Sequence, residues 1–278
     1  MLVLRSTKDL RESMNQGRGM CVLVPTMGAL HQGHLSLIRQ AVAIAKPQNG
    51  RVVVSIFVNP IQFDCKGDLE AYPRTEADDL KACENEGVDF VFIPDESDMY
   101  AADRSVIVAE SILSSGLCGS ARPGHFDGVC TVVLKLLLIT GCHVVIFGEK
   151  DFQQLAIIRR MVRDLNVPVD VVSQPTLRES DGLAMSSRNA SLTAEQRADA
   201  PRLFRALSDA SCLLDPTAIL DYVVKQIEAS DLARIDYVEL VDAETLQPAS
   251  SLEQATILAL AVFYGEVRLI DHVRLPAL

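Results

Sequence analysis

The sequence of 278 residues predicts an α/β protein built on a parallel sheet, with a smaller α+β domain at the C-terminal end. Through the first 170 or so residues, short apolar runs rich in Val and Ile alternate with segments of helical spacing. Apolar strands that alternate with helices are typical of a parallel sheet covered on both faces. After Ser173 the alternation stops, and clustered helices followed by strands indicate a separate α+β unit.

The apolar runs and helical spacings place each expected element. In the first part we expect strands at 21–25, 51–58, 88–93, 143–147 and 167–172, and helices at 33–46, 75–86, 126–140 and 151–165. In the second part we expect a loop at 178–189, helices at 193–214 and 216–230, and strands at 235–241, 256–262 and 267–270. These elements predict a Rossmann-like domain over residues 1–175 and an α+β domain over residues 176–278, with right-handed crossovers in the first.

Composition excludes several classes of protein. The formal net charge of −11 argues against a general nucleic-acid partner, although a few cations and backbone N–H groups suffice for a local phosphate pocket. The seven cysteines form no Cys-x-x-Cys pair, so we expect reduced thiols rather than a disulfide framework or a structural zinc site. The longest apolar stretch, 132–139, is interrupted by Lys135 and is too short to span a bilayer. Without a signal-like N-terminus, we expect a cytoplasmic protein with no membrane partner.

The strongest motif is Pro-Thr-Met-Gly-Ala-Leu-His-Gln-Gly-His, which ends at His34 and joins the first long strand to the first long helix. Ligands bind at the carboxyl ends of strands in open α/β sheets, and a helix N-terminus there suits a phosphate. Gly28 and Gly33 permit close backbone approach. His31 and His34 lie three residues apart and would stabilise charge on a phosphate. The alternatives are a zinc pair, although the His-Glu-x-x-His pattern is missing, or ordinary polar histidines.

Two further loops also follow expected strands. After 51–58, Asn59 and Gln62 offer amides to a small polar substrate, with a simple Asn-Pro turn as the alternative. After 143–147, Lys150 stands at the start of an expected helix, where a positive charge is unfavourable because it opposes the helix dipole. A bound anion would explain why a lysine occupies this position. Asp151 is either part of that site or only a helix N-cap. One of Gln153 and Gln154 is expected to face the pocket.

Three lesser segments complete the candidate site. Ala-Met-Ser-Ser-Arg-Asn at 184–189 supplies hydroxyls and Arg188 for a phosphate clamp that closes as a lid, or else serves as an interdomain linker. A Gly-rich turn carries Arg122 and His125. Asp78 and Asp79 follow the segment Tyr-Pro-Arg-Thr. One of the two acids is a candidate magnesium ligand. The alternative for Asp78 is a role in capping the helix that begins after Thr75.

Taken together, these motifs resemble the pantothenate synthetase family of the His-x-Gly-His nucleotidyltransferase superfamily. Segment 27–34 is similar to the His-x-Gly-His signature, and Met-Ser-Ser-Arg at 185–188 to the second signature of that superfamily. The specific set is Pro-Thr-Met-Gly, Phe-Val-Asn-Pro-x-Gln-Phe, Tyr-Pro-Arg-Thr, Arg-Pro-Gly-His-Phe, Gly-Glu-Lys-Asp-Phe-Gln-Gln and Ser-Ser-Arg-Asn. The resemblance covers essentially the whole chain.

The resemblance implies a role for each matched residue. The ATP-binding set would be Met27, Gly28, Ala29, Leu30, His31, Gln32, Gly33, His34, Gly148, Glu149, Lys150, Asp151, Leu177, Met185, Ser186, Ser187 and Arg188. The catalytic subset would be His31, His34, Lys150, Ser186, Ser187 and Arg188, and Gln62 and Gln154 would hold pantoate, with Gln62 also contacting β-alanine. Their residue types and loop positions add Asn59, Arg122 and His125 to the expected substrate-binding set. The resemblance also implies Mg²⁺ as a cofactor, a homodimer, a first domain that binds ATP and pantoate, and a second that covers the substrate as a lid.

The implied reaction is a ligation driven by ATP. The carboxylate of pantoate would attack the α-phosphorus of ATP, releasing pyrophosphate, and the amine of β-alanine would capture the pantoyl-adenylate to give pantothenate and AMP. Such chemistry needs positioning and charge neutralisation rather than an activated Ser or Cys nucleophile. One alternative is a nucleotidyltransferase that acts on a phosphate acceptor, but Gln62 and Gln154 suit a small hydroxy acid better. The other is a nucleotide-binding module without turnover, but the chain retains His34, Lys150 and Arg188.

Overall fold

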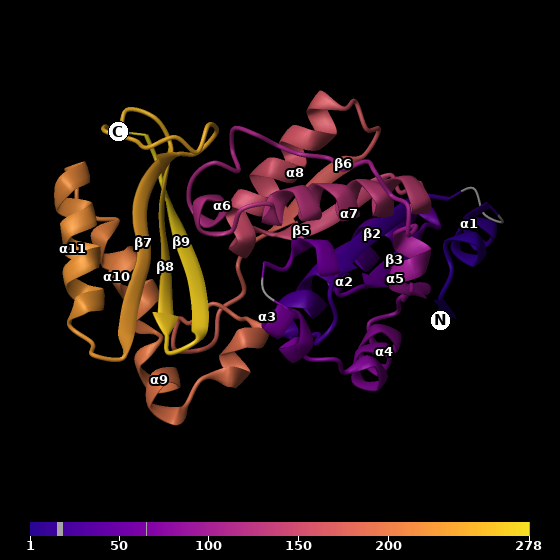
Figure 1. Ribbon diagram of the computed structural model, residues 1–278, viewed down its shortest axis with the longest axis horizontal. Coiled ribbons are helices and arrows are strands. Elements are labelled where there is room, and N and C mark those ends of the chain that lie inside the picture. Colours follow the sequence, from indigo (N-terminus) through magenta and orange to yellow (C-terminus); the bar gives the residue numbers. More distant parts are fainter. Residues whose placement is uncertain (16–18, 65, 278) are drawn as a thin grey trace. The chain divides into compact units, whose positions relative to one another are not determined.

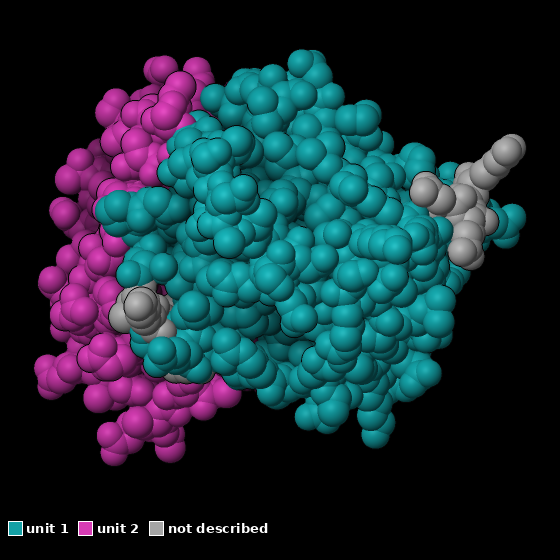
Figure 2. All heavy atoms as spheres, turned by 45° about the vertical axis from the view of Figure 1, so that its right-hand side comes forward, with its two compact units in different colours: residues 1–110, 122–149, 154–175 teal, residues 111–121, 150–153, 176–278 magenta. Residues whose placement is uncertain are grey.

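The computed structural model describes residues 1–15, 19–64 and 66–277, so Cys65 lies outside the described residues. The chain divides into two compact units, coloured separately in Figure 2. The N-terminal unit comprises residues 1–110, 122–149 and 154–175. The C-terminal unit comprises residues 111–121, 150–153 and 176–278, so it takes in two short segments that lie early in the sequence.

A six-stranded sheet forms the centre of the N-terminal unit (Figure 1). Its strands are β1 (Leu2–Leu4), β2 (Cys21–Thr26), β3 (Arg51–Ile56), β4 (Phe90–Phe92), β5 (Val144–Gly148) and β6 (Asp170–Gln174). They lie in the order β1-β4-β3-β2-β5-β6, and every neighbouring pair is parallel. The predicted Rossmann-like parallel sheet is confirmed.

Helices cover both faces of this sheet, as expected for strands that are apolar on both sides. They are α1 (Thr7–Asn15), α2 (Gln32–Ala45), α3 (Lys66–Ala71), α4 (Glu76–Asn85), α5 (Glu96–Met99), α7 (His125–Thr140) and α8 (Phe152–Asp164), with 3₁₀ turns η1 (Lys46–Gln48), η2 (Pro60–Gln62) and η3 (Glu149–Asp151). Ile38 and Ala41 of α2 pack against Val22 and Val54 of the strands. Leu23 alternates to the opposite face, where α7 contacts β2.

The strand order sets the position of the candidate site. From β2 the chain moves outward through β3 and β4, and then returns to add β5 on the other side of β2. The carboxyl ends of β2 and β5 therefore meet where the strand order reverses, which is where open α/β sheets bind their ligands. Residues 27–31 join β2 to α2, and Gly148 ends β5 directly before Glu149.

An antiparallel sheet of β7 (Ala233–Asp242), β8 (Thr256–Tyr264) and β9 (Val267–Leu275) organises the C-terminal unit. Its helices are α6 (Cys118–Ala121), α9 (Ala194–Asp199), α10 (Arg202–Ala210) and α11 (Pro216–Glu228), and η4 (Ser187–Ser191) is a 3₁₀ turn. Leu258 and Leu260 of β8 pack on Leu203 of α10 and Ile219 of α11. The predicted α+β character of this part is confirmed.

The two early segments of the C-terminal unit join it through specific contacts. Tyr237 of β7 hydrogen-bonds Cys118 of α6, with 3.4 Å between Oη and Sγ. The ring of His272 in β9 lies 5.2 Å from the ring of Phe152, measured between centroids. These contacts tie residues 111–121 and 150–153 to the small sheet.

The expected helix over 193–214 is wrong as a single element. It is split into α9 and α10, and Pro201 stands between them. Proline lacks the N–H for an i→i−4 bond, and its ring clashes with the preceding turn. The first two elements, β1 and α1, have no counterpart among the expected elements.

The described part of the chain lacks membrane spans and disulfides. None of the described helices has the length and apolarity needed to cross a membrane. The described cysteines, Cys21, Cys83, Cys118, Cys130, Cys142 and Cys212, form no disulfide with one another.

Candidate active site

One buried carboxylate fixes the backbone of the loop that leaves β2. Asp79 of α4 accepts the backbone N–H of Ala29 at 3.0 Å and that of Leu30 at 2.8 Å. The Thr75 hydroxyl donates to the same carboxylate at 3.2 Å. Asp79 is only 2% exposed, so these three donors provide the compensation that a buried carboxylate requires. The loop is thus fixed to a helix that lies about 50 residues further along the chain.

The backbone of this loop takes an unusual path at Gly28 and Ala29. Both have positive φ angles, 82° and 50°, a region that non-glycine residues seldom adopt. A Cβ atom at Gly28 would lie 3.0 Å from an oxygen of Asp79 and 3.1 Å from Ile56 Cγ2. Glycine is therefore required both by its conformation and by the close approach of Asp79.

This arrangement argues against the expected magnesium role of Asp78 and Asp79. Asp78 is exposed, whereas Asp79 is buried and its two oxygens accept hydrogen bonds from the loop. The Asp79 oxygens are thus engaged by the loop and by Thr75, which argues against Asp79 as a Mg²⁺ ligand. Among residues 1–15, 19–64 and 66–277, no group of three or more His, Cys, Asp or Glu residues could hold a metal ion.

His31 and His34 form the N-terminal cap of α2. Nδ1 of His31 accepts the Gly33 N–H at 3.1 Å, and Nδ1 of His34 accepts the His31 N–H at 3.3 Å. The two rings lie 4.1 Å apart between centroids. Because Nδ1 accepts in both rings, each neutral imidazole carries its proton on Nε2 and can donate there. The positive end of the helix dipole adds to this cap, so the site suits an anion.

The loop after β3 presents Gln62 and holds Asn59 behind it. Asn59 is 2% exposed, and its amide has a partner for each atom. Its Nδ2 donates to Gln62 Oε1 at 2.9 Å and to the Gly128 carbonyl at 3.1 Å, and its Oδ1 accepts the Tyr100 hydroxyl at 2.7 Å. We expected Asn59 to bind substrate, but these bonds occupy its donors and give it a supporting role.

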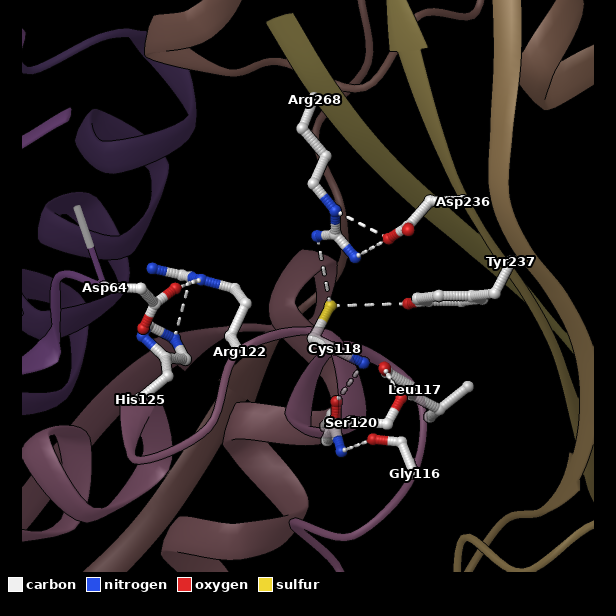
Figure 3. Close-up of polar contacts among 11 residues, drawn as sticks. Asp64, Gly116, Leu117, Cys118, Ser120, Arg122, His125, Asp236, Tyr237 and Arg268 are labelled. Carbon is white, nitrogen blue, oxygen red and sulfur yellow. Dashed lines mark hydrogen bonds and ion pairs between the residues drawn. The ribbon is translucent and has the colours of Figure 1, made fainter. Parts of the chain in front are cut away.

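Arg122 and His125, also expected to bind substrate, support the backbone of Gln62. Figure 3 shows the contacts of Arg122 with Asp64 and His125. His125 Nδ1 donates to the Gln62 carbonyl at 2.7 Å, and Arg122 Nη2 donates to it at 3.3 Å. Arg122 also lies 3.1 Å from His125 Nε2 and 2.7 Å from Asp64 Oδ2, each measured from a guanidinium nitrogen. The network of Asp64, Arg122 and His125 therefore fixes where Gln62 stands.

Gly148 ends β5, and Glu149 follows it as the last residue of this segment of the N-terminal unit. The Glu149 carboxylate accepts the Ser173 hydroxyl at 2.9 Å, and Arg159 donates to that hydroxyl oxygen at 3.1 Å. Gln154 lies on α8 and is half-buried. These bonds link the ends of β5 and β6 at the same edge of the sheet.

In the C-terminal unit, Lys150 and Asp151 precede α8. Lys150 Nζ lies 3.8 Å from Asp151 Oδ1, and the two side chains are 21% and 50% exposed. Gln153 is 6% exposed and bonds the 113–118 loop: it accepts the Cys118 N–H at 3.0 Å and donates to the carbonyls of Leu113 and Gly116. Of the two glutamines in this turn, Gln153 is therefore structural.

The expected lid segment is a closed and well-anchored loop. The Met185 N–H donates to the Leu177 carbonyl at 3.0 Å. Arg178 makes a two-pronged ion pair with buried Asp271, at 2.6 and 2.9 Å. Asn189 Nδ2 donates to Glu179 at 3.0 Å. These bonds join the loop to the sheet that carries Asp271, so it is part of the C-terminal unit.

The signature residues lie at the end of this loop. Ser186 caps η4 by accepting the Arg188 N–H at 3.3 Å on its hydroxyl oxygen. Ser187 begins η4, and Met185, Ser186, Ser187 and Arg188 are all partly exposed. Backbone N–H groups, hydroxyls and a guanidinium on one turn are suited to binding phosphate oxygens.

The sequence as a whole matches one family model. The model for pantoate-beta-alanine ligase matches residues 2–274. The chain belongs to the pantoate–β-alanine ligase family. Among curated relatives, the pantothenate synthetase of Akkermansia muciniphila is 50% identical over 258 residues, covering 91% of this chain and 92% of that protein. The pantothenate synthetase of Thermotoga neapolitana is 47% identical over 274 residues, covering 97% and 96%.

Solved structures of pantoate–β-alanine ligases share this fold. A crystal structure of pantothenate synthetase from Thermus thermophilus has a TM-score of 0.92 at 40% identity, covering 98% of this chain and 99% of that chain. The pantoate-beta-alanine ligase of Francisella tularensis, complexed with beta-gamma ATP and beta-alanine, has a TM-score of 0.82 at 32% identity, covering 98% and 97%.

Within the N-terminal unit of this ligase, the structure brings several expected residues to one edge of the sheet. The contact between them is direct: Gln62 Nε2 donates to Met27 Sδ at 3.1 Å, which joins the loops after β2 and β3. Tyr100 and the supporting role of Asp79 were missed. Their partners lie 41 and about 50 residues away, so no local motif marks them.

The ligase has no thiol suited to nucleophilic catalysis among its described buried cysteines. Burial raises the pKa of Cys21, Cys83 and Cys130 to about 12 and that of Cys142 to about 11. A thiol with such a pKa stays protonated near neutral pH and is a poor nucleophile.

Proposed function

We propose that this protein condenses pantoate with β-alanine to form pantothenate, with ATP cleaved to AMP and pyrophosphate and pantoyl-adenylate as the intermediate. The family match over residues 2–274 carries the proposal. The relative from Francisella tularensis, crystallised with beta-gamma ATP and beta-alanine, supports the two ligands. The preorganised loop at the switch point of the sheet provides a place for the nucleotide.

In the first step, the pantoate carboxylate attacks the α-phosphorus and pyrophosphate leaves. His31 and His34 donate from Nε2 at the N-terminus of α2, where their donors and the helix dipole stabilise negative charge that builds on the phosphates. Lys150, Ser186, Ser187 and Arg188 supply the remaining cationic and hydroxyl donors. Stabilising charge in this way is the largest contribution that such a site makes.

Magnesium is assigned only as the counter-ion of ATP. When bound, the cation neutralises phosphate charge, and the phosphates themselves supply ligands to it. The carboxylate oxygens of Asp79 already accept hydrogen bonds from the loop, so we derive no step through the metal. Asp79 acts on the reaction by holding the loop that carries His31.

Gln62 and Gln154 are assigned to pantoate. Gln62 stands where the Met27 loop meets η2 and is 8% exposed, and Gln154 lies in the first turns of α8. In the second step, the β-alanine amine attacks the acyl carbon of pantoyl-adenylate and AMP leaves. Gln62 also contacts the amine-bearing substrate in this proposal, so it orients both reactants.

The C-terminal unit is assigned the role of a cover that protects the adenylate from water. The loop from Leu177 to Asn189 is tied to Asp271, so it belongs to the unit that is assigned this role.

A homodimer in the cytoplasm completes the proposal. Large apolar side chains are exposed on the N-terminal unit at Val106, Ile107 and Leu138, with exposed fractions of 78%, 58% and 62%, and a partner subunit would cover them. Light scattering on the purified protein measures the mass directly, and a monomer at micromolar concentration would contradict the dimer.

Product formation tests the function. We expect equal amounts of AMP and pantothenate from ATP, pantoate and β-alanine, and no sustained AMP release when pantoate is omitted. Without β-alanine, pyrophosphate release should stop after about one equivalent per site and almost no AMP should be released, because the AMP group stays in the bound and shielded adenylate. Release of ADP, or turnover that ignores pantoate, would contradict the proposal.

A further inference from the structure

The side chain of Gln62 is held in one orientation by a chain of hydrogen bonds that begins in α7. Gly128 lies in this helix and has no side chain, so η2 packs directly on the helix backbone. A Cβ atom at Gly128 would lie 2.5 Å from the Ile61 carbonyl oxygen and 2.7 Å from Gln62 Cα. This close approach brings the Asn59 amide within 3.1 Å of the Gly128 carbonyl.

The Gly128 carbonyl determines which way the Asn59 amide points. A backbone carbonyl can only accept, so the atom facing it must be Nδ2. The other hydrogen of Nδ2 then points to Gln62 at 2.9 Å, where it needs an acceptor, and Oε1 is the acceptor in the Gln62 amide. Gln62 Nε2 is thereby turned the other way, toward Met27 Sδ at 3.1 Å.

Tyr100 is the last member of this series of hydrogen bonds. With Nδ2 committed, Asn59 Oδ1 needs a donor, and the Tyr100 hydroxyl supplies it at 2.7 Å. Tyr100 is 8% exposed, so no bulk water replaces this donor. Burial raises the pKa of the Tyr100 hydroxyl above its usual range, so the group keeps its proton and donates throughout the pH range of an assay.

We propose that Tyr100, acting through Asn59, holds the Gln62 amide with its NH₂ group toward the substrate, so that this position selects an oxygen that accepts a hydrogen bond. The inference rests on the proposed binding of pantoate by Gln62. The thioether of Met27 is a weak acceptor, whereas a carboxylate or hydroxyl oxygen of a hydroxy acid is a strong one. Tyr100 is a positioning residue, because it touches Asn59 and acts on the substrate only through Gln62.

Steady-state kinetics of Tyr100→Phe tests the positioning role. Loss of the hydroxyl leaves Asn59 Oδ1 buried without its donor and removes one of the three bonds that hold the Asn59 amide against Gln62. We expect the KM for pantoate to rise by about 3- to 10-fold, the scale of one neutral hydrogen bond, while the KM for ATP stays unchanged. Tyr222→Phe is the matched control, because it also removes one tyrosine hydroxyl bond, to Asp209, in α11 of the C-terminal unit.

A double-mutant cycle separates positioning from general destabilisation. Gln62→Ala removes the amide through which Tyr100 acts, so Tyr100→Phe should add no further rise in the KM for pantoate in that background. If the two effects multiplied instead, Tyr100 would act independently of Gln62 and the inference would be overturned. An unchanged KM in Tyr100→Phe alone would overturn it as well.

Gln62→Glu tests the direction of the amide. The substitution keeps an oxygen toward Asn59 and puts an acidic oxygen where Nε2 stood, with almost no change in volume. We expect a higher KM for pantoate than in Gln62→Ala, because two acceptors then face each other. A lower KM than in Gln62→Ala would show that the position accepts rather than donates.

Activity of the wild-type protein shows whether the positioning role alone fails or the proposed function fails with it. Pantoate-dependent AMP release by the wild type, combined with independent effects of Tyr100 and Gln62, would overturn the positioning role alone. Absence of pantoate-dependent release by the wild type would overturn the proposed function, and this inference with it.

Discussion

The carboxylate of Asp79 accepts the backbone N–H of Leu30 at 2.8 Å, and this bond ties α4 to the loop that carries both site histidines. A second bond, from Ala29, holds a residue whose φ of 50° is costly for an L-amino acid. Such strain costs on the order of 1–3 kcal/mol and persists only where the surroundings enforce it. Asp79 therefore fixes the backbone of this loop before any ligand binds.

Replacing this carboxylate should impair ATP use. In Asp79→Asn, one acceptor oxygen becomes an NH₂ group that faces a backbone N–H. We expect kcat/KM for ATP to fall by about 5- to 150-fold, which corresponds to the roughly 1–3 kcal/mol cost of a buried unsatisfied group. Initial rates with varied ATP at a fixed excess of Mg²⁺ measure this. Glu84→Gln is the control, since Glu84 is an exposed acid on the same helix.

Magnesium titration of the same variant separates the loop-holding role from metal binding. If Asp79 holds the loop, a higher Mg²⁺ concentration should leave the defect of Asp79→Asn unchanged. Recovery of the wild-type rate at high Mg²⁺ would instead identify Asp79 as a metal ligand.

His34→Ala should lower turnover by at least roughly 10²-fold, the usual scale for losing one acid–base or charge-stabilising group. Measurement of kcat at saturating ATP, pantoate and β-alanine tests this. His143→Ala is the matched control, because His143 accepts the Cys21 N–H at the opposite edge of the sheet. A kcat for His34→Ala within about twofold of the wild type would remove His34 from the phosphate site.

Lys150→Ala should slow formation of the adenylate and leave its capture intact. The cation is assigned to the phosphates, so its loss acts only while pyrophosphate is leaving. Rapid-quench measurements of the two half-reactions check this. If the substitution slowed only the reaction of preformed adenylate with β-alanine, Lys150 would belong to the amine side of the site.

The stability of the C-terminal unit should depend on the charge of Asp199. Burial alone would raise the pKa of this carboxyl, but hydrogen bonds from Arg202, Ser230 and Tyr264 outweigh it and hold the pKa below its ordinary value of 3.8. A pKa that is lower in the folded state means that the charged form stabilises the fold. This contribution is present above the unfolded-state pKa and is lost as the pH falls through the folded-state pKa.

Asp199→Asn should therefore lower the free energy of unfolding by about 1–3 kcal/mol near pH 7. The difference from the wild type should shrink below about pH 4, where the wild-type carboxyl also becomes neutral. Urea unfolding at several pH values measures it, with Asp221→Asn as an exposed control on α11. A difference that stayed constant into the acid range would contradict the role of charge.

Much of the fold was predictable because periodicity reports burial. The apolar runs of β2, β3 and β5 are buried on both faces, and those strands appear close to their expected limits. β1 was not predictable from pattern, because its three residues are half-exposed and too few to show a period. Pro201 was visible in the sequence, and its cost inside a helix predicts the break between α9 and α10.

Site residues that directly follow a strand were predictable from the sequence. Residues whose partners lie far away in the sequence were not. His31 and His34 stand on a loop and helix start that the sequence marks clearly. Asn59, Arg122 and His125 were recognised as site residues and expected to touch substrate, because only the fold shows that they hold Gln62. Tyr100 carries no local signal, since its bond to Asn59 joins separate elements.

Exchange of labelled pyrophosphate into ATP tests the central claim most directly. Reversible formation of pantoyl-adenylate at the site of His31 and His34 predicts exchange that requires pantoate and Mg²⁺ and proceeds without β-alanine. His34→Ala should reduce the exchange rate as strongly as it reduces turnover. Exchange that proceeds without pantoate, or that appears only when β-alanine is added, would contradict the account.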